Sequence, residues 1–277
     1  MASEDHSKHY ENFPVASLLL PRHLREPIAA IYAFARSADD FADEGELTAN
    51  ERLTLLRGYQ HELNAIAENQ PTTHPVFLRL RPVITQYRLP LSLFHDLLDA
   101  FMQDVTRNRY ASHVELLDYC RRSANPVGRL LLHLFAAVTD ENVICSDAIC
   151  TALQLINHWQ DVGIDTGKGP EGRIYLPEED LNRFQVKPQD ILRRVISAEF
   201  LKLMRFEVDR TRALMLQGAP LGRALHGRIG LEIRTIIHGG LRILEKIEAV
   251  NYDVFNHRPK LQMLDWPIIG WRALFEP

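Results

Sequence analysis

Two aspartates four residues apart, Asp39 and Asp43, end a segment rich in alanine and aromatic residues. At about 100° per residue, Tyr32, Arg36 and these two aspartates fall on one stripe of a helix. Carboxylates at this spacing repel each other, so we expect a cation to reach them from outside the helix. A lone acidic cluster is more often a solvated helix face, and this segment alone leaves both interpretations open.

A second polar stripe is predicted in the later half of the chain. Gln154, Asn157, Asp161 and Asp165 would share one face of a helix. All four offer oxygen ligands, which Mg²⁺ prefers, whereas histidine and cysteine suit zinc or copper. A solvated polar face is the alternative, although surface helices usually mix charge signs and this stripe has no basic residue. His158 lies off the stripe, and we expect it to pack or to hydrogen-bond at the surface.

Taken together, the two stripes predict a site on opposite walls of one apolar cavity. Mg²⁺ takes only one or two carboxylates per ion and completes its shell with water and substrate phosphate. We therefore expect several Mg²⁺ ions that bridge a substrate diphosphate, promote its departure and leave a carbocation between aromatic walls. Past the second stripe, a loop with Lys168 and Arg173 could close over the diphosphate, although an ordinary turn is the alternative.

Helical periodicity dominates the chain, and signals for β-strands are scarce. We predict an all-α fold, a single-domain helical bundle over residues 5–277 around a central apolar cavity, without repeats or flexible linkers. Pro126 should bend the helix that contains it. The predicted helices are Pro27–Asp43, Ala49–Glu68, Pro90–Arg107, His113–Val138, Ser146–Gly163, Lys187–Gln217 and Gly222–Ala249.

Composition restricts the class of partner. The net charge of −4 offers no electrostatic case for nucleic acid, whose phosphates require a basic surface. Three cysteines without metal-ligand spacing are expected to be thiols in a reducing cytosol. The polar N-terminus resembles no targeting peptide, and no apolar run reaches the ~20 residues that span a bilayer. We expect a cytoplasmic protein.

The C-terminal stretch Leu261–Phe275 carries Trp266 and Trp271 among other apolar residues. We expect this tail to cap the core. The alternative is contact with a partner or with the inner face of the membrane, because tryptophan favours such interfaces.

Five ordered blocks make the chain resemble the squalene/phytoene synthase family, the head-to-head isoprenyl diphosphate synthases. The resemblance extends from His9 to about Lys260 and implies an isoprenoid synthase fold with an isoprenoid diphosphate substrate. The blocks are Leu18-Leu19-Leu20-Pro21 with Ala30–Arg36 leading into Asp39-x-x-x-Asp43; Glu115-Leu116-x-x-Tyr119-Cys120; Val127-Gly128; Leu153–Asn157 leading into Asp161-Val162-Gly163-x-Asp165; and Arg173–Pro177.

Three segments resemble the hydroxysqualene synthase branch of this family: His9–Val15, Tyr119–Gly128 and Asn157–Asp161. That resemblance implies conversion of presqualene diphosphate and water to hydroxysqualene and pyrophosphate, in squalene and hopanoid biosynthesis. It implies no requirement for NADPH. It also implies functional coupling to a presqualene diphosphate synthase and to a flavin-dependent reductase that forms squalene.

The same resemblance assigns expected roles to individual residues. The metal-binding set is expected to be Asp39, Asp43, Asn157, Asp161 and Asp165. Contacts with the substrate are expected from His9, Asn12, Tyr32, Arg36, Gln154, Lys168, Arg173 and Tyr175. The residues expected to act on the reacting centre are Tyr119, Arg36 and Asn125.

Departures from the family pattern bear on the reaction. Gln160 replaces an arginine, Ser123-Ala124-Asn125 replaces Val-Ala-Gly, and a tyrosine is missing around His238. A more polar pocket favours capture of a cation by water over condensation of two prenyl chains, so we do not carry the condensing half-reaction over.

Three other hypotheses stay open. One is head-to-head condensation of farnesyl or geranylgeranyl diphosphate to presqualene diphosphate, squalene or phytoene. Another is a carboxylate-bridged di-metal helical bundle, although no glutamate here has a histidine three residues later. The last is a helical scaffold without catalytic activity.

Overall fold

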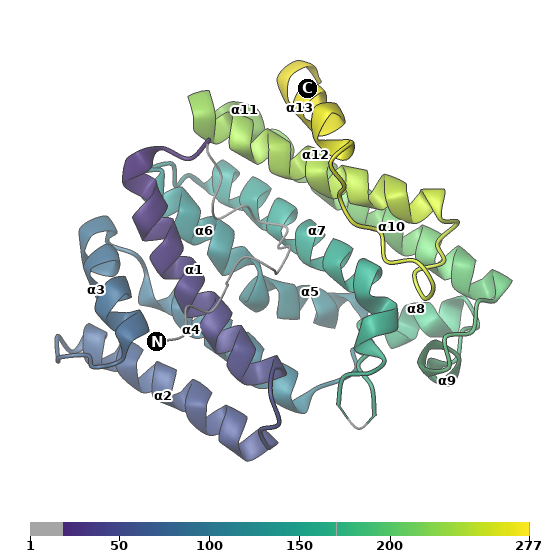
Figure 1. The fold of residues 1–277 in the computed structure, drawn as a ribbon, viewed down its shortest axis with the longest axis horizontal. Helices are drawn as coiled ribbons and strands as arrows, with labels where there is room; N and C mark the ends of the chain where they lie inside the picture. Colours follow the sequence, from purple (N-terminus) through teal and green to yellow (C-terminus); the bar gives the residue numbers. More distant parts are fainter. Residues whose placement is uncertain (1–18, 170, 277) are drawn as a thin grey trace.

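The described part of the chain is helical, as predicted. A computed structural model describes residues 19–169 and 171–276, and these form thirteen helices joined by loops, with no strand (Figure 1). The helices are α1 (Arg22–Asp43), α2 (Ala49–Ala67), α3 (Pro75–Tyr87), α4 (Leu91–Thr106), α5 (His113–Ser123), α6 (Asn125–Leu134), α7 (Asp140–Asp165), α8 (Glu178–Arg183), α9 (Pro188–Leu192), α10 (Ala198–Gly218), α11 (Leu221–Ala224), α12 (Gly227–Ala249) and α13 (Asp265–Phe275).

Two apolar clusters build the bundle. The first lies among α1 to α4 and α6 and contains Phe34, whose ring meets Tyr59, Phe77 and Phe94. The second lies mainly among α5, α7, α10 and α12 and contains the fully buried Trp159. The Trp159 Nε1 atom donates to Thr211 Oγ1 at 2.8 Å, which satisfies the buried indole and ties α7 to α10.

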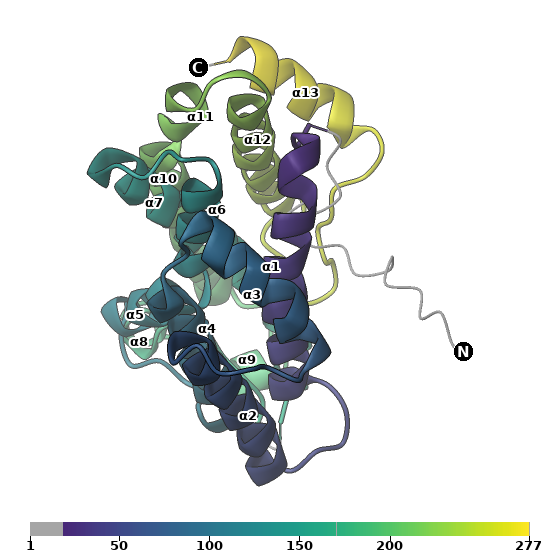
Figure 2. The same ribbon diagram turned by 90° about the vertical axis from the view of Figure 1, so that its left-hand side faces the viewer.

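The helices α1 and α7 expose one polar face each because their other faces are buried in these clusters. On α1, the buried side chains include Ile31, Phe34, Ala38 and Ala42, so the stripe that carries the aspartates is turned away from the first cluster. Thr139 caps the start of α7 by accepting from the Asn142 backbone N–H. Figure 2 shows α1 running the length of the bundle beside the other helices.

Two of the predicted helices are each interrupted in the structure, one near a proline and the other at a residue with positive φ. The stretch predicted as His113–Val138 ends α5 at Ser123 and restarts as α6, because Pro126 fits only the first turn of a new helix. This confirms the predicted bend. The stretch Lys187–Gln217 divides at Arg194, whose φ is 55°, into α9 and α10. The helix α3 was not predicted, because Pro75 and Pro82 interrupt its pattern.

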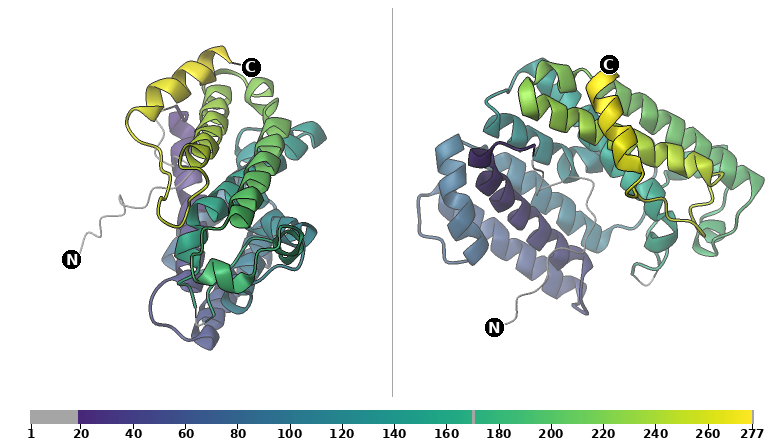
Figure 3. Two further views of the ribbon diagram at one scale, coloured as in Figure 1. Left: turned by 90° about the vertical axis from the view of Figure 1, so that its right-hand side faces the viewer. Right: turned by 45° about the horizontal axis from the view of Figure 1, so that its top comes forward.

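The C-terminal tail forms α13 and caps the core, as expected. Ile269 and Ala273 are fully buried, and the helix packs against α12. Figure 3 shows α13 lying on the outer side of α12. Among the described residues, every helix is too short or too polar to cross a bilayer.

Candidate active site

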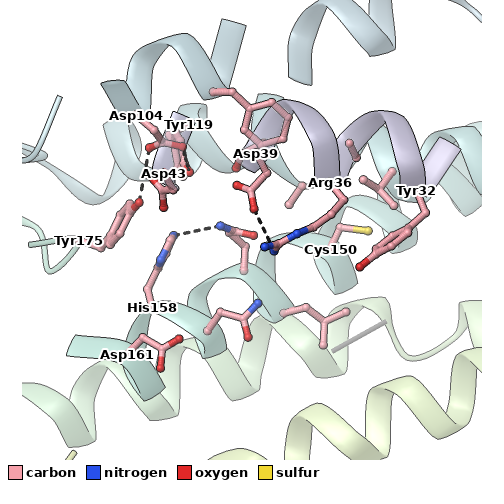
Figure 4. Close-up of a pocket in the computed structure, with 18 of the residues that line it drawn as sticks. Tyr32, Arg36, Asp39, Asp43, Asp104, Tyr119, Cys150, His158, Asp161 and Tyr175 are labelled. Atoms are coloured by element: carbon pink, nitrogen blue, oxygen red, sulfur yellow. Dashed lines mark hydrogen bonds and ion pairs between the residues drawn. The ribbon is translucent and has the colours of Figure 1, made fainter. Parts of the chain in front are cut away.

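A cavity of about 440 Å³ lies between α1, α4, α5, α6 and α7 (Figure 4). Its apolar side chains come from the earlier parts of α1 and α7 and from α4 and α6, whereas its carboxylates come from the later ends of α1, α4 and α7. The structure thus brings the two polar stripes onto one cavity. Lining it are the predicted residues Tyr32, Arg36, Asp39, Asp43, Tyr119, Gln154, Asn157, Asp161, Asp165, Lys168 and Tyr175. Their roles in binding stay predictions.

On the α1 side, Arg36 is held by carboxylates of its own helix and the loop that follows. Its guanidinium lies 2.6 Å from Asp40, 2.6 Å from Glu44 and 3.4 Å from Asp39. Burial, and then the neighbouring charge of Asp43, raise the pKa of Asp39 to about 6. The positive charge near the Asp39 carboxylate is therefore too small to offset desolvation and the repulsion from Asp43.

Asp43 is clamped by the loop after α7. Lys168 Nζ lies 2.9 Å from Asp43 Oδ2, and Arg173 Nη2 lies 3.1 Å from Asp43 Oδ1. Burial disfavours the charged carboxylate, but the two basic groups outweigh it and hold the pKa of Asp43 below its usual value. The loop after α7 thus contacts the end of α1 through Lys168 and Arg173, and its closure over a diphosphate stays a prediction.

On the α7 side, Asp161 forms a two-pronged ion pair with Arg258, whose Nη2 lies 2.9 Å from Asp161 Oδ2. Sequence analysis missed Arg258, because a lone arginine in a loop has no periodic signal. The adjacent Gln160 is turned away from the cavity, and its Nε2 donates to the Pro259 carbonyl at 2.6 Å. Gln160 thereby fastens the segment that carries Arg258 to α7.

Asp165 is the most buried carboxylate of the α7 stripe. Its nearest cation is Lys168 at 3.4 Å. Burial raises the pKa of Asp165 to about 6 despite that lysine. Two of the predicted metal ligands, the buried Asp165 and the partly exposed Asp39, thus have raised pKa values and too little positive charge around them.

Behind the carboxylates lies a buried network around Asp104. Tyr119 Oη donates to Asp104 Oδ2 at 2.8 Å, and Tyr175 Oη donates to Oδ1 at 3.4 Å. Arg173 Nη2 donates to the Asp104 carbonyl at 2.8 Å. Asp104 was not predicted from the sequence, because no other carboxylate lies three or four residues away from it on α4. The network fixes the hydroxyl of Tyr119, the residue predicted to act near the reacting centre.

His158 packs as expected, but it does so in the cavity wall rather than at the surface. Its ring stacks on Tyr175 with centroids 3.6 Å apart and planes 14° apart. Burial, followed by the charges of Lys168 and Arg173, lowers the pKa of His158 well below its usual value. The imidazole is therefore neutral at physiological pH and extends the polar wall beside Gln154, whose Nε2 lies 3.4 Å from His158 Nε2.

Two predicted residues of the described part do not line the cavity, and one of them is Arg173, whose contacts with Asp43 and Asp104 are given above. Asn125 is buried, does not line the cavity, and accepts from Thr151 Oγ1 at 2.8 Å, which joins α6 to α7. Its neighbours Ser123 and Ala124 do line the cavity. His9 and Asn12 fall outside the described residues.

The donor set suits Mg²⁺ held jointly with a substrate. The carboxylates of Asp39, Asp43, Asp161 and Asp165 and the amide carbonyl of Asn157 offer oxygen ligands, and the carboxylates of Asp39 and Asp165 lack full compensation of charge. Within residues 19–169 and 171–276, no group of three His, Cys, Asp or Glu side chains could hold a metal ion alone. A hard cation that completes its shell with phosphate and water fits this arrangement better than one caged by protein.

Burial raises the pKa of Asp104 to about 7, and this predicts how stability depends on pH. Between pH 3.8, the ordinary pKa of an aspartate, and about pH 7, the folded chain binds more protons at this site than the unfolded chain. The contribution of Asp104 to stability therefore falls as pH rises through that range. Asp104→Asn should remove this dependence, so the variant should gain on the order of a few kcal/mol relative to the parent between about pH 5 and about pH 8. Denaturant unfolding of both proteins at the two pH values measures their free energies of unfolding. If the difference between variant and parent is the same at both pH values, the prediction is wrong.

Comparison with known proteins identifies the family. Residues 6–265 match the family model described as "Squalene/phytoene synthase". The chain is 35% identical to the hydroxysqualene synthase of Rhodopseudomonas palustris over 95% of this chain and 88% of that protein. It is 30% identical to the phytoene synthase of Arthrospira platensis over 96% of this chain and 90% of that protein.

A solved structure agrees with this assignment. The crystal structure of squalene synthase HpnC from Alicyclobacillus acidocaldarius superimposes with a TM-score of 0.80 at 38% identity, covering 88% of this chain and 90% of that one. The chain belongs to the squalene/phytoene synthase family and is an enzyme. The family assignment excludes the two hypotheses of a carboxylate-bridged di-metal bundle and of a helical scaffold without catalytic activity.

Proposed function

We propose that this chain converts presqualene diphosphate and water to hydroxysqualene and pyrophosphate in a Mg²⁺-dependent reaction. The observation that carries the proposal is the meeting of the aspartate-bearing ends of α1 and α7 at one end of an apolar cavity. The similarity to hydroxysqualene synthases, at 35% identity over most of the chain, supports this particular substrate.

The polar end of the cavity would bind the diphosphate. Mg²⁺, when bound, would neutralise the leaving group and ease its departure. Lys168, Arg173 and Arg258 now pair with Asp43 and Asp161, so they would be free to contact phosphate once those aspartates bind metal. The carbon–oxygen bond to the diphosphate would break there, and the hydrocarbon would lie against the apolar walls.

The polar wall around Tyr119 supports capture of the cation by water. His158 is neutral and buried, and Gln154 and Ser123 add hydrogen-bonding groups to the same cavity. A neutral imidazole and an amide can orient water without adding positive charge beside a carbocation. The cyclopropylcarbinyl cation would rearrange with opening of a ring carbon–carbon bond, and a bond from water oxygen to carbon would form. The proton lost by water would pass to the released pyrophosphate.

Head-to-head condensation is the second candidate. The observation that favours it is the 30% identity to a phytoene synthase over nearly the whole chain. Condensation would need room for two prenyl diphosphates in the cavity of about 440 Å³.

A product assay separates the two. Purified protein with Mg²⁺ and no NADPH is incubated with presqualene diphosphate or with farnesyl diphosphate, and the extracted lipids are identified by mass spectrometry. We expect hydroxysqualene from presqualene diphosphate only, with the hydroxyl oxygen taken from labelled water and no product when EDTA is present. Consumption of farnesyl diphosphate alone would overturn the proposal.

A coupled assay tests the proposed pathway partners. Addition of a presqualene diphosphate synthase should allow farnesyl diphosphate to be used, and addition of a flavin-dependent reductase should convert the product to squalene. Failure of the first addition to supply substrate would contradict the proposed place in the pathway.

A further inference from the structure

The outer face of α13 and the turn before it form an exposed apolar surface. Met263 and Leu264 are more than four-fifths exposed, at 86% and 82%. Trp271 and Phe275 are 64% and 65% exposed, and their rings are in contact, with centroids 4.3 Å apart and planes tilted by 39°. We define the α13 surface as Met263, Leu264, Trp266, Ile268, Trp271, Leu274 and Phe275. Gathered apolar surfaces of this kind mark interaction sites, whereas single exposed apolar residues are ordinary.

The two charged residues within α13 are withdrawn from this surface. Asp265 is 3% exposed and accepts from Arg242 Nε at 2.7 Å and from Lys246 Nζ at 2.6 Å. Arg272 donates to Glu245 at 2.5 Å. Both charges are therefore held against α12, and only the indole N–H groups of the α13 surface can form side-chain hydrogen bonds. A protein partner usually supplies and requires about one hydrogen bond per 100–200 Å² of interface, whereas lipid requires none.

The location of α13 agrees with a lipid surface. Ile28, Leu131 and Leu153 of the apolar lining come from the earlier parts of α1 and α7 and from α6, whereas the carboxylates lie at the later ends of α1, α4 and α7. Figures 1 and 2 both place α13 and the start of α1 on the same, upper side of the molecule. The apolar part of the cavity lined by Ile28 and the α13 surface thus lie toward the same side of the molecule.

We propose that the α13 surface docks onto a lipid bilayer and lies in its interfacial layer. Tryptophan favours that layer, because its ring is apolar and its N–H is polar. At 11 residues, α13 is too short to span the bilayer, which needs about 20. Since no unpaired basic side chain lies on the α13 surface, apolar burial rather than attraction to anionic lipid drives the contact. Docking goes beyond the proposed function, because the reaction in the cavity does not itself require contact with a bilayer.

Tryptophan fluorescence tests the proposal directly. Of the three tryptophans, Trp159 is fully buried, so any change on adding lipid reports Trp266 and Trp271. Neutral phosphatidylcholine vesicles should shift the emission to shorter wavelength and carry the full-length protein upward in a flotation gradient. Raising the salt concentration should change the bound fraction less than about twofold, because the contact is apolar. Emission and flotation that both stay unchanged would overturn the proposal.

A pair of matched variants locates the contact. Trp271→Ser combined with Phe275→Ser should lower vesicle affinity at least about tenfold, because burial of one large apolar side chain is worth more than that. Val114→Ser combined with Ile144→Ser removes two apolar residues, 75% and 69% exposed, from other surfaces and should leave affinity unchanged. Thermal unfolding first establishes that both variants are folded.

The remaining outcomes each decide against the proposal. Equal losses in the two variants would show binding that is not specific to α13. A dimer that the α13 variant dissociates, without vesicle binding by the parent, would make this surface an interface between copies of the chain. Short-wavelength emission from Trp266 and Trp271 before lipid is added, unchanged afterwards, would mean that another segment of the chain covers the surface. Vesicle binding is measured without substrate, so failure of the proposed function would not affect this result.

Discussion

Replacing Asp161 with asparagine should reduce turnover of presqualene diphosphate at least about a thousandfold, since metal-assisted charge neutralisation contributes several kcal/mol. The same loss is expected for Asp39→Asn on the opposite wall. Both aspartates line the polar end of the cavity, on α7 and α1 respectively. Asparagine keeps the shape of the side chain and removes the charge that would hold Mg²⁺. Rates at saturating Mg²⁺ and substrate measure the effect.

These substitutions should leave the fold nearly intact. Asp39 has a raised pKa, so removal of its charge relieves an unfavourable interaction with Asp43. Removal of the Asp161 charge leaves Arg258 without its partner, but the Arg258 side chain is 35% exposed and can be hydrated. We expect the free energy of unfolding to change by no more than about 1 kcal/mol in either variant.

The chain offers a closely matched control on the same helix. Asp147 also lies on α7, its side chain is 22% exposed against 23% for Asp161, and it also forms a two-pronged ion pair, with Arg129. It lies outside the cavity. Asp147→Asn should therefore retain turnover. Full activity in Asp161→Asn, or an equal loss in Asp147→Asn, would contradict the placement of the metal ligands.

The largest loss of stability is expected from Arg173→Gln. The Arg173 guanidinium is nearly buried, pairs with Asp43, donates to the Asp104 carbonyl and lies over the Tyr175 ring. Its removal would leave the partly buried Asp43 carboxylate and the buried Asp104 carboxyl group without their main cation. Loss of one partner from a buried ion pair costs about 3–5 kcal/mol. The midpoint of thermal unfolding should fall by on the order of 10 °C.

Lys168→Gln provides the comparison for Arg173→Gln. Lys168 pairs with the same Asp43, but its side chain is 41% exposed, so water can replace much of what it contributes. We expect a loss below about 1 kcal/mol. Calorimetry of both variants in the same buffer tests the difference. A drop for Lys168→Gln as large as that for Arg173→Gln would show that exposure does not decide the outcome here.

Much of the site was predictable because its residues repeat at helical spacing. The stripes that contain Asp39, Asp43, Asp161 and Asp165 could be recognised from local periodicity, since residues four apart share a helix face whatever surrounds the helix. The bend at Pro126 was predictable for the same local reason, because proline lacks the N–H that a helix interior requires. Capping of the core by the Trp266–Trp271 segment followed from its apolar residues.

The remaining features depend on contacts between residues far apart in the chain. Asp104 and Tyr119 are 15 positions apart, and Asp161 and Arg258 are 97 apart, so no short pattern links them. His158 lies off its stripe but reaches the cavity wall through its stack on Tyr175. Asn125 belongs to a recognised block, yet its side chain turns toward Thr151.

The helical class, the faces that carry oxygen donors and the family could be recognised from the order of the amino acids. Which charges neutralise one another, and which lack compensation, depends on how the helices and loops pack. A helix's own residues set which side chains share a face, whereas the pKa of a carboxylate such as Asp39 or Asp104 depends on burial and on cations supplied by other helices and loops.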